Sequence, residues 1–474
     1  MTFLNNLKEI LQSFYMGRVY PVIVVLMMFC AYTTSTEAYI NLASLLLLSV
    51  GLLVCDSLRP LIPVMISYLY QFSVNTAMPT PEGLAALFSG TSLVLYVVSF
   101  SILAICLVLF FLKNKLFTLE NLKTLPLPIA AIVFSVTFLT NGIFSDRYVF
   151  TSTLYGALQI FTILGIFYIF YLGLKNDNHG ELVDYLAYTT ALVAILVFAD
   201  TVFLYTAHGK DFISNGVIDR GLMLYGWGNC NTAGNCAAVL IPMCYYGVMK
   251  SKTPAFYFIS ASLAMAAAFL STSRNALLVG GAFYVLCFIF CCFVGKSRVK
   301  FAIFASVTLA VLGVAFYVFK DTTVMVMDQY IKRGLGSVER IKLWEYAVEA
   351  FKESPVFGKG FFGLWTDTYH LEWGFPTMLH NTPLQLLACS GVVGFIGYLF
   401  YRICSLKPFI IKPSLEKTML GFAILVVLIG SLADNFVFYI PHMLYYPIAM
   451  ALAFKIYDDE EQGILDYYHY ITRW

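Results

Sequence analysis

Residues 254–294 read PAFYFISASLAMAAAFLSTSRNALLVGGAFYVLCFIFCCFV, two apolar runs joined by the polar turn STSRN at 271–275. Each run is about long enough to cross the roughly 30 Å of bilayer hydrocarbon as an α-helix. Arg274 therefore stands where two predicted spans meet. The alternation of apolar run and polar turn continues in both directions, which predicts an all-helical membrane protein.

The composition of the whole chain supports this prediction. Of 474 residues, 60% are hydrophobic and only 12% are charged, whereas soluble domains are about a quarter charged. The first apolar run is followed by another span and not by a small-residue cleavage site, so we expect no signal peptide. We expect about fourteen spans, near 18–36, 38–55, 59–75, 88–112, 125–141, 149–174, 182–206, 231–249, 254–271, 274–294, 299–319, 384–402, 417–433 and 438–456.

The distribution of basic residues predicts the orientation. With both termini inside, the inner segments hold 18 Lys and Arg and the short outer segments hold 4, as the positive-inside rule requires. The resulting organisation is a membrane region 1–319 with an external segment 207–230, an external loop 320–383, further spans in 384–456, and a cytoplasmic tail 457–474.

Other features exclude several functions. The formal net charge is +2 and no basic block is present, which argues against a nucleic-acid partner. The 11 cysteines and 6 histidines are scattered without metal-ligand spacing. We therefore expect no metal and no other cofactor, and we interpret the cysteines as small apolar core residues.

The 320–383 loop contains one clear predicted helix, at about 338–353. Ser337 can cap it and Pro355 follows its end. Ile341, Trp344, Val348 and Phe351 recur on one face, so the helix should lie on the bundle or on the membrane surface. Beyond it, GKGFFG at 358–363 matches a nucleotide-binding pattern by letter only, because no strand precedes it. We interpret it as a turn, although its backbone N–H groups could still meet a phosphate.

Three residues are the strongest candidates for chemistry. Arg274 is either a snorkelling residue that marks a helix end or an anion clamp. Arg220, on the same predicted side, is an ordinary loop arginine by itself but could join Arg274 at a diphosphate. His380 precedes Asn381-Thr-Pro383, so it is either a residue at a helix entry or a base for a hydroxyl proton. Weaker base candidates are Asp200, His370, Glu372, Asp434 and His442.

Taken together, these segments resemble the bacterial O-antigen ligase/polymerase family of polytopic membrane proteins. Arg220-Gly221 leads to Asn231, and Ser273-Arg274 follows. The loop carries Arg340-Ile-Lys-Leu-Trp344 and Pro355 to Gly360. His380-Asn381 and then Gly391-Val-Val-Gly394 complete the resemblance, which covers roughly 207–400.

The resemblance implies a metal-independent glycosyltransferase in the bacterial plasma (inner) membrane, with its site facing outward. The donor would be an undecaprenyl-diphosphate-linked oligosaccharide and the acceptor a glycan or lipid hydroxyl. Arg220 and Arg274 would hold the diphosphate, and His380 would deprotonate the acceptor. We also expect Asn231, Arg340, Trp344 and Asn381 at the substrate.

Within this resemblance we favour a polymerase of polysaccharide repeat units over a ligase that passes glycan to a terminal acceptor. A chain-length regulator or a flippase could be a partner. The alternative from another class is a transporter of lipid-linked sugars. It would need alternating access, and the two halves of the chain show no repeat of the kind common in transporters.

Overall fold

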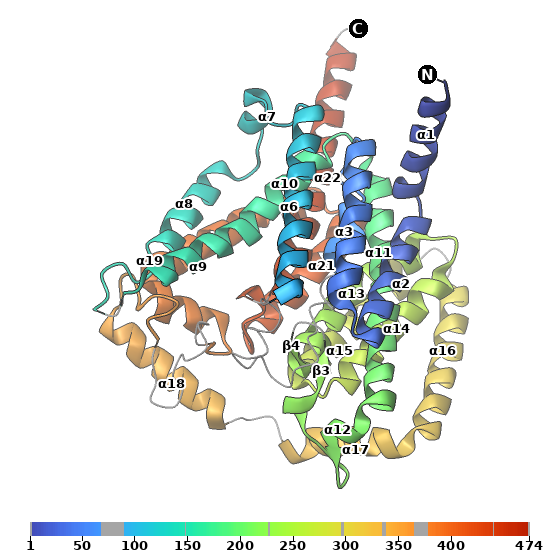
Figure 1. Cartoon of the computed structure of the whole chain (residues 1–474), viewed down its shortest axis with the longest axis vertical. Coiled ribbons are helices and arrows are strands. Elements are labelled where there is room, and N and C mark those ends of the chain that lie inside the picture. The colour runs from blue at the N-terminus through green and yellow to red at the C-terminus, as the bar shows by residue number, and fades with distance from the viewer. Residues whose placement is uncertain are drawn as a thin grey trace. The chain divides into compact units, whose positions relative to one another are not determined.

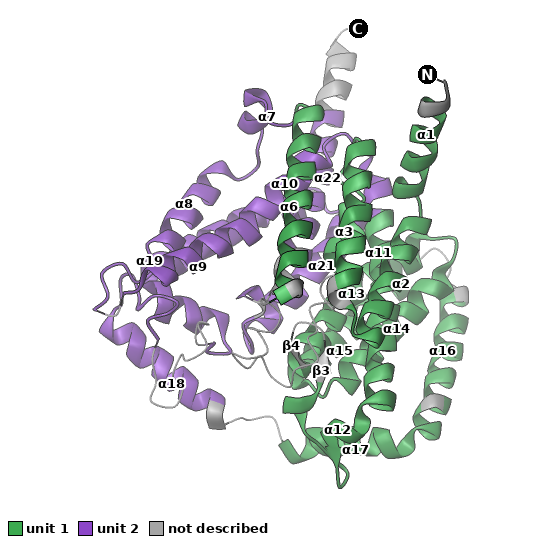
Figure 2. Ribbon diagram, in the orientation of Figure 1, with its two compact units in different colours: residues 1–115, 184–336 green, residues 116–183, 337–474 purple. Residues whose placement is uncertain are grey.

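The computed structural model describes residues 2–67, 90–146, 148–225, 228–294, 298–333, 338–364, 378–438 and 440–472. Helices make up most of this part of the chain (Figure 1). The chain divides into two compact units (Figure 2), residues 1–115 with 184–336 and residues 116–183 with 337–474. The division between the two units passes through helix α11 (His179–Ala207).

Unit 1 contains most of the first half of the chain. Its first helices are α1 (Thr2–Met16), α2 (Val19–Thr34), α3 (Glu37–Val54), α4 (Leu61–Ser67) and α6 (Gly90–Lys113). After α11 come α12 (Gly209–Phe212), the 3-10 helix η3 (Arg220–Leu222), α13 (Cys230–Lys250), α14 (Pro254–Leu270), α15 (Arg274–Val294), α16 (Arg298–Val318) and α17 (Lys320–Arg333).

Unit 2 combines a short middle segment with the C-terminal part. The middle segment has α7 (Leu119–Lys123), α8 (Pro128–Leu139), α9 (Phe150–Ile160), the π-helix η2 (Phe161–Gly165) and α10 (Ile166–Gly173). The C-terminal part has α18 (Val338–Glu353), α19 (Thr382–Ser405), α20 (Lys407–Ile410), α21 (Leu415–Gly430), the 3-10 helix η4 (Phe436–Phe438) and α22 (Ile440–Thr472).

Several of these helices are suited to a bilayer. Within the described residues, 7 helices are long and apolar enough to cross a membrane, or 8 if α1 and α2, which bend by 62°, form one span. Three shorter apolar helices lie at Tyr39–Val54, Pro128–Leu139 and Pro254–Leu270. A multi-pass membrane protein is thus confirmed. The count of fourteen spans and the outward orientation stay predictions, and much of the predicted 59–75 span lies outside the described residues.

Two small hairpins interrupt the helical pattern in the predicted external segment. Strand β1 (Ile213–Ser214) pairs antiparallel with β2 (Val217–Ile218), and β3 (Leu224–Tyr225) pairs with β4 (Gly228–Asn229). Asn215 and Gly216 connect the first pair with φ values of 51° and 72°, the left-handed values that favour Asn-Gly in two-residue hairpins. The expectation of helices alone was incomplete in this segment.

The core of unit 1 forms around α13. This helix packs against α14 and α15, and small residues allow close approach. A side chain at Gly234 would collide with Ser271, and one at Gly280 would lie against Ala238. The start of α13 is thereby held against the turn 271–273. A cluster around Leu204, Phe212, Met223, Cys230, Ala233 and Val326 fills the adjoining space.

The glycine segment of unit 2 fits into a break in α19. At Gly391 the helix is interrupted, with φ 63° and ψ −165°, and the segment 355–360 bonds to the backbone groups around the break. Lys359 N–H donates to Ala388 O at 2.8 Å and Gly360 N–H to Cys389 O at 2.8 Å. In return, the N–H groups of Val392 and Val393 donate to Pro355 O and Val356 O.

The interpretation of GKGFFG as a turn that brings backbones together is confirmed, and the idea of a phosphate at its amides is wrong. The N–H groups of Gly358 and Gly363 donate to the carbonyls of Ser354 and Gly360. Those of Phe361 and Phe362 donate to side chains of α8–α9, Asn141 Oδ1 and Ser152 Oγ. Because every N–H from 358 to 363 is used within the protein, none remains for an anion.

A buried lysine fixes the same segment. Lys359 is 7% exposed, and its Nζ lies 2.8 Å from Glu353 Oε2 and 3.3 Å from Asp146 Oδ1. Burial alone would lower the pKa of Lys359, but the hydrogen bonds and charges of Glu353 and Asp146 raise it above its ordinary value. The ammonium therefore links the end of α18 to the segment after α8.

The 320–383 loop contains more helix than its sequence indicated. The predicted helix 338–353 is confirmed as α18, and its expected cap Ser337 lies outside the described residues. Its packed face differs from the prediction. Leu343, Ala347 and Ala350 are buried, whereas Ile341 and Val348 are exposed. A second helix, α17, was not predicted, because its polar sequence shows neither a clear apolar face nor a strong cap.

Candidate functional site

The turn between α14 and α15 in unit 1 carries a strained residue. Thr272 has φ 56°, a left-handed conformation that is unusual for a β-branched side chain. The turn is nonetheless well held, because Thr272 N–H donates to Phe269 O at 3.1 Å and the Ser273 hydroxyl accepts from Ala276 N–H in the first turn of α15. Such strain persists where the surrounding structure imposes it, often at functional sites.

Arg220 approaches this turn from the hairpin region. Its Nε donates to Thr272 Oγ1 at 2.9 Å, and its Nη2 donates to Asn231 Oδ1 at 2.5 Å. The side chain of Asp219 caps the short helix that carries Arg220 by accepting from Gly221 N–H. The structure thus brings Arg220 to the turn that ends in Arg274, as the sequence suggested, and Asn231 orients the Arg220 guanidinium.

Arg274 and a third arginine, Arg333, complete the arrangement. Arg274 Nη1 donates to Arg333 O at 3.2 Å, and Arg333 Nη1 donates to Thr272 O at 3.4 Å. Arg333 is the last residue of α17 and is half-buried. It was missed at the sequence level, where the only available signal was a basic residue shortly after a predicted span.

The three guanidiniums, which we call the arginine cluster (Arg220, Arg274 and Arg333), suit one kind of ligand. Each stays protonated under all working conditions and presents planar N–H donors that match phosphate oxygens. Arg220 uses two of the five N–H donors of a guanidinium in the bonds above. An anion with several phosphate oxygens is therefore the ligand that the cluster is best suited to bind.

Unit 2 contains a histidine paired with a buried carboxylate. His380 Nδ1 lies 2.8 Å from Asp434 Oδ1, and Asp434 is 1% exposed. Asn435 N–H also donates to Asp434 Oδ1, at 2.9 Å. His380 has φ 51°, so its backbone is in the left-handed region. Asp434 was only a weaker base candidate in the sequence, and in the structure it is the partner of the leading one.

The charges around Asp434 determine its ionisation. Burial would raise the pKa of this carboxyl, but the hydrogen bond and charge of His380, with the charge of Arg340, outweigh it and hold the pKa below its ordinary value. Arg340 Nη2 lies 4.0 Å from Asp434 Oδ2, and its Nη1 donates to Ala433 O at 2.6 Å. A carboxylate in this position holds the His380 ring in one orientation and leaves Nε2 for a proton from elsewhere.

The other predicted residues of unit 2 support this pair. Asn381 Oδ1 caps α19 by accepting from Leu384 N–H at 3.0 Å, and its Nδ2 donates to Leu432 O. Trp344 Nε1 donates to Leu379 O at 3.1 Å. Asn381 is therefore the N-cap of α19, and Trp344 fixes the residue before His380. Contact of either with substrate stays a prediction.

The predicted convergence of Arg220, Arg274 and His380 is not tested, because the arginines belong to unit 1 and the histidine to unit 2. His370 and Glu372 lie outside the described residues. Asp200 in α11 is buried, and its Oδ1 has no hydrogen-bond partner within the described part of the chain. In the same part, no group of three His, Cys, Asp or Glu could hold a metal.

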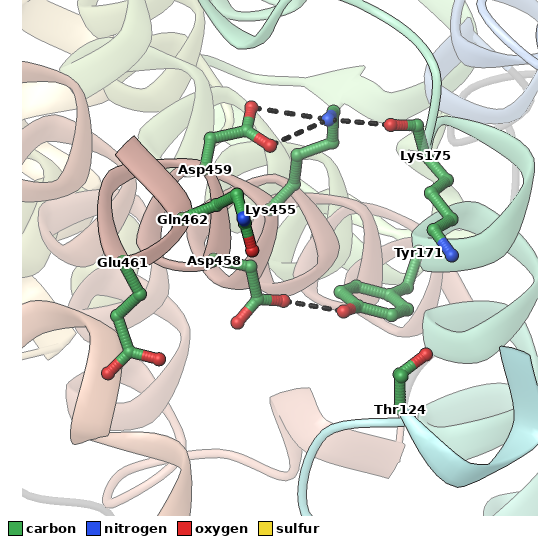
Figure 3. Close-up of a pocket in the computed structure, with 8 residues that line it drawn as sticks. All are labelled: Thr124, Tyr171, Lys175, Lys455, Asp458, Asp459, Glu461 and Gln462. Carbon is green, nitrogen blue, oxygen red and sulfur yellow. Dashed lines mark hydrogen bonds and ion pairs between the residues drawn. The ribbon is translucent and has the colours of Figure 1, made fainter. Parts of the chain in front are cut away.

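A pocket of about 410 Å³ lies elsewhere in unit 2, between α10 and α22 (Figure 3). Tyr171 Oη donates to Asp458 Oδ2 at 2.5 Å, and Lys455 Nζ donates to Lys175 O at 2.8 Å and to Asp459. Asp434 lies just before α22, and Asp458 is the nineteenth residue of that helix. At 1.5 Å of rise per residue, the pocket is about 25 Å along α22 from the His380 pair. The pocket and the histidine pair are therefore separate sites.

Comparison with known proteins identifies the middle of the chain. Residues 259–399 match the family model described as O-antigen ligase. The match includes Arg274, Arg333, Arg340 and His380, whereas Arg220 precedes it. Comparison with curated proteins found no match. Because members of this family are glycosyltransferase-like enzymes, an O-antigen ligase or polymerase type of activity is indicated. The resemblance seen in the motifs is confirmed over residues 259–399, which are similar to the O-antigen ligase family.

Proposed function

We propose that the protein polymerises oligosaccharide repeat units carried on undecaprenyl diphosphate, at the outer face of the bacterial plasma membrane. The growing glycan leaves its diphosphate and is joined to a hydroxyl of another repeat unit. Ligation to a terminal acceptor uses the same chemistry with a different acceptor. The two differ only in which hydroxyl reaches the histidine.

The observation that carries the proposal is the His380–Asp434 pair. A general base must lie within hydrogen-bonding reach of the proton that it removes, and it works best in a fixed tautomer. Asp434 is buried and holds Nδ1 at 2.8 Å, which favours the tautomer with its hydrogen on Nδ1 and its free electron pair on Nε2. The imidazole is 30% exposed, so a hydroxyl can approach it.

The proposed reaction is a single displacement. The acceptor oxygen attacks the anomeric carbon while its proton moves to His380 Nε2, and the bond from that carbon to the diphosphate oxygen breaks. The electron pair of the broken bond stays on the diphosphate, which leaves with one more negative charge. His380 then loses its proton to solvent, and the anomeric configuration is inverted.

The arginine cluster supports a phosphate-bearing donor. Fixed cations stabilise charge that develops on a leaving group, because they need no rearrangement when the reaction occurs. The proposal therefore places Arg220 and Arg274 at the diphosphate, and it requires unit 1 to bring them to the same substrate as His380. Since arginines carry this charge, turnover should persist in the presence of a chelator.

The test uses the full-length protein, purified in detergent, with an undecaprenyl-diphosphate oligosaccharide. Longer lipid-linked glycans are the expected product. If the glycan appears only on an added terminal acceptor, the protein is a ligase. If the wild type moves the lipid across liposomes without forming a glycosidic bond, it is a transporter. Wild-type turnover in both Arg274→Ala and His380→Ala would show that the site is wrong.

A further inference from the structure

The third member of the arginine cluster comes from a helix with no assigned role. Lys332 and Arg333 both occupy the last turn of α17, where the helix dipole favours cations. Lys332 behaves as expected for a surface residue, since its side chain is 66% exposed and lies 3.4 Å from Asp328 one turn earlier. Arg333 instead reaches across to Thr272 O. The helix dipole therefore accounts for a basic residue such as Lys332 at the end of α17. It does not account for the contact of the Arg333 side chain with Thr272 O.

Arg333 is linked to both other arginines through short paths. Its guanidinium bonds the carbonyl of Thr272, whose hydroxyl accepts from Arg220. Its own carbonyl accepts from Arg274. The last residue of α17 therefore adds one charge to the cluster and also orients the Arg274 side chain.

We propose that Arg333 binds the diphosphate as it leaves, and acts more strongly on the leaving group than on the intact donor. This inference rests on the proposed function. A diphosphate linked at both ends, to lipid and to sugar, carries two negative charges. After transfer its terminal phosphate is free and approaches a third charge near neutral pH. Three guanidiniums thus match the product and the late transition state better than the donor.

The kinetic consequence is specific. Interactions that strengthen between ground state and transition state raise kcat, whereas those equal in both change KM. Arg333→Gln should therefore lower kcat about 10- to 100-fold, which is a smaller loss than removal of an oxyanion-hole donor usually causes. The KM for the donor should change by less than about threefold. Inhibition by inorganic pyrophosphate should weaken by roughly the same factor as kcat, since it resembles the free leaving group.

The matched control is Lys332→Gln, which removes one positive charge from the same helix turn. It should change both quantities by less than about twofold, because an exposed pair contributes little. Arg333→Lys keeps the charge without the planar fork and should recover part of the loss. If thermal unfolding shows that Arg333→Gln does not fold, kcat and pyrophosphate inhibition are compared between Arg333→Lys and wild type instead.

The proposed function and the proposed role of Arg333 can be tested separately. Binding of inorganic pyrophosphate and of inorganic phosphate to the full-length protein is measured by titration, without any glycosyl transfer. Tighter binding of pyrophosphate that weakens in Arg333→Gln, in a protein that transfers no glycan, supports the anion site and overturns the proposed function. Glycan transfer with unchanged kcat and unchanged pyrophosphate inhibition in Arg333→Gln overturns the role of Arg333 and leaves the function standing.

Discussion

The arginine cluster of unit 1 and the histidine pair of unit 2 hold their basic side chains in opposite ways. Arg220 bonds the neutral oxygens of Thr272 and Asn231, and the bonds described for Arg274 and Arg333 end on backbone carbonyls. His380 and Arg340 instead face the buried carboxylate of Asp434.

The difference indicates what each region is built to meet. The neutral oxygens of Thr272 and Asn231 orient the Arg220 guanidinium without cancelling its charge, so the attraction of Arg220 for an external anion remains. A buried carboxylate compensates the charge of its partners and fixes the tautomer of a base. The first arrangement suits binding of a charged leaving group, and the second suits transfer of a proton.

Removal of the base should have the largest effect. His380→Asn is the best replacement, because asparagine tolerates the left-handed backbone that His380 adopts. Turnover should fall about 10³-fold, within the range that general-base catalysis supplies. Binding of inorganic pyrophosphate should stay within about twofold of wild type, since the arginine cluster is untouched. Product formation and titration on the same preparation measure the two.

The chain offers a matched control for this variant. His208 also pairs with a carboxylate, at 3.2 Å from Asp211 Oδ2, but both side chains are largely exposed. His208→Asn should therefore leave turnover unchanged. An equal loss in the two variants would mean that imidazole–carboxylate pairs in this protein act through general stability, and the assignment of His380 as base would be abandoned.

The partner of the histidine should affect both rate and stability. Asp434→Asn removes the charge that orients His380, and kcat should fall roughly 10- to 100-fold, part of what the base supplies. It also leaves Arg340 without its buried carboxylate partner, which should cost about 3 kcal/mol of unfolding free energy at pH 7.

The stability lost in Asp434→Asn should depend on pH. The pKa of Asp434 lies below its ordinary value in the folded protein, so its contribution to stability is present above the unfolded value of about 4. That contribution is lost as the pH falls through the folded-state pKa. Thermal unfolding of wild type and Asp434→Asn should converge at acid pH. A difference that stays constant from pH 7 to pH 3 would contradict the role of the charge.

The sequence predicted the parts of the site that depend on local pattern. The span boundaries place Arg274 at a turn, Asn381 is a recognisable cap, and the helix 338–353 follows from its flanking residues. Asp434 and Arg333 could not be assigned in this way. Asp434 is 54 residues from His380, and their contact depends on how α19 packs against the end of α21. Arg333 meets Thr272 only because α17 folds back onto the turn.

Long-range backbone contacts were also invisible in the sequence. Gly391 and Gly394 were noted as a motif, but the break at Gly391 exists because the segment 355–360 bonds into it. Composition alone marks a glycine as permissive and cannot tell which backbone will approach it. The same limit applies to the two units, whose charged groups must meet for the proposed reaction.

The smallest predicted effect comes from the break itself. Alanine at Gly391 would need φ 63°, and its Cβ would collide with Val356 O, so Gly391→Ala should lose about 2 kcal/mol of stability. Gly313→Ala is the matched control, because Gly313 lies within α16 and a Cβ added there would meet no neighbouring atom within 4 Å. This variant should gain up to ~1 kcal/mol of stability.

Because the break lies in unit 2, Gly391→Ala should reduce glycan transfer while pyrophosphate binding persists. Loss of both together would show that the glycine segment also maintains the arginine cluster, and the separation between an anion-binding region and a proton-transfer region would have to be given up.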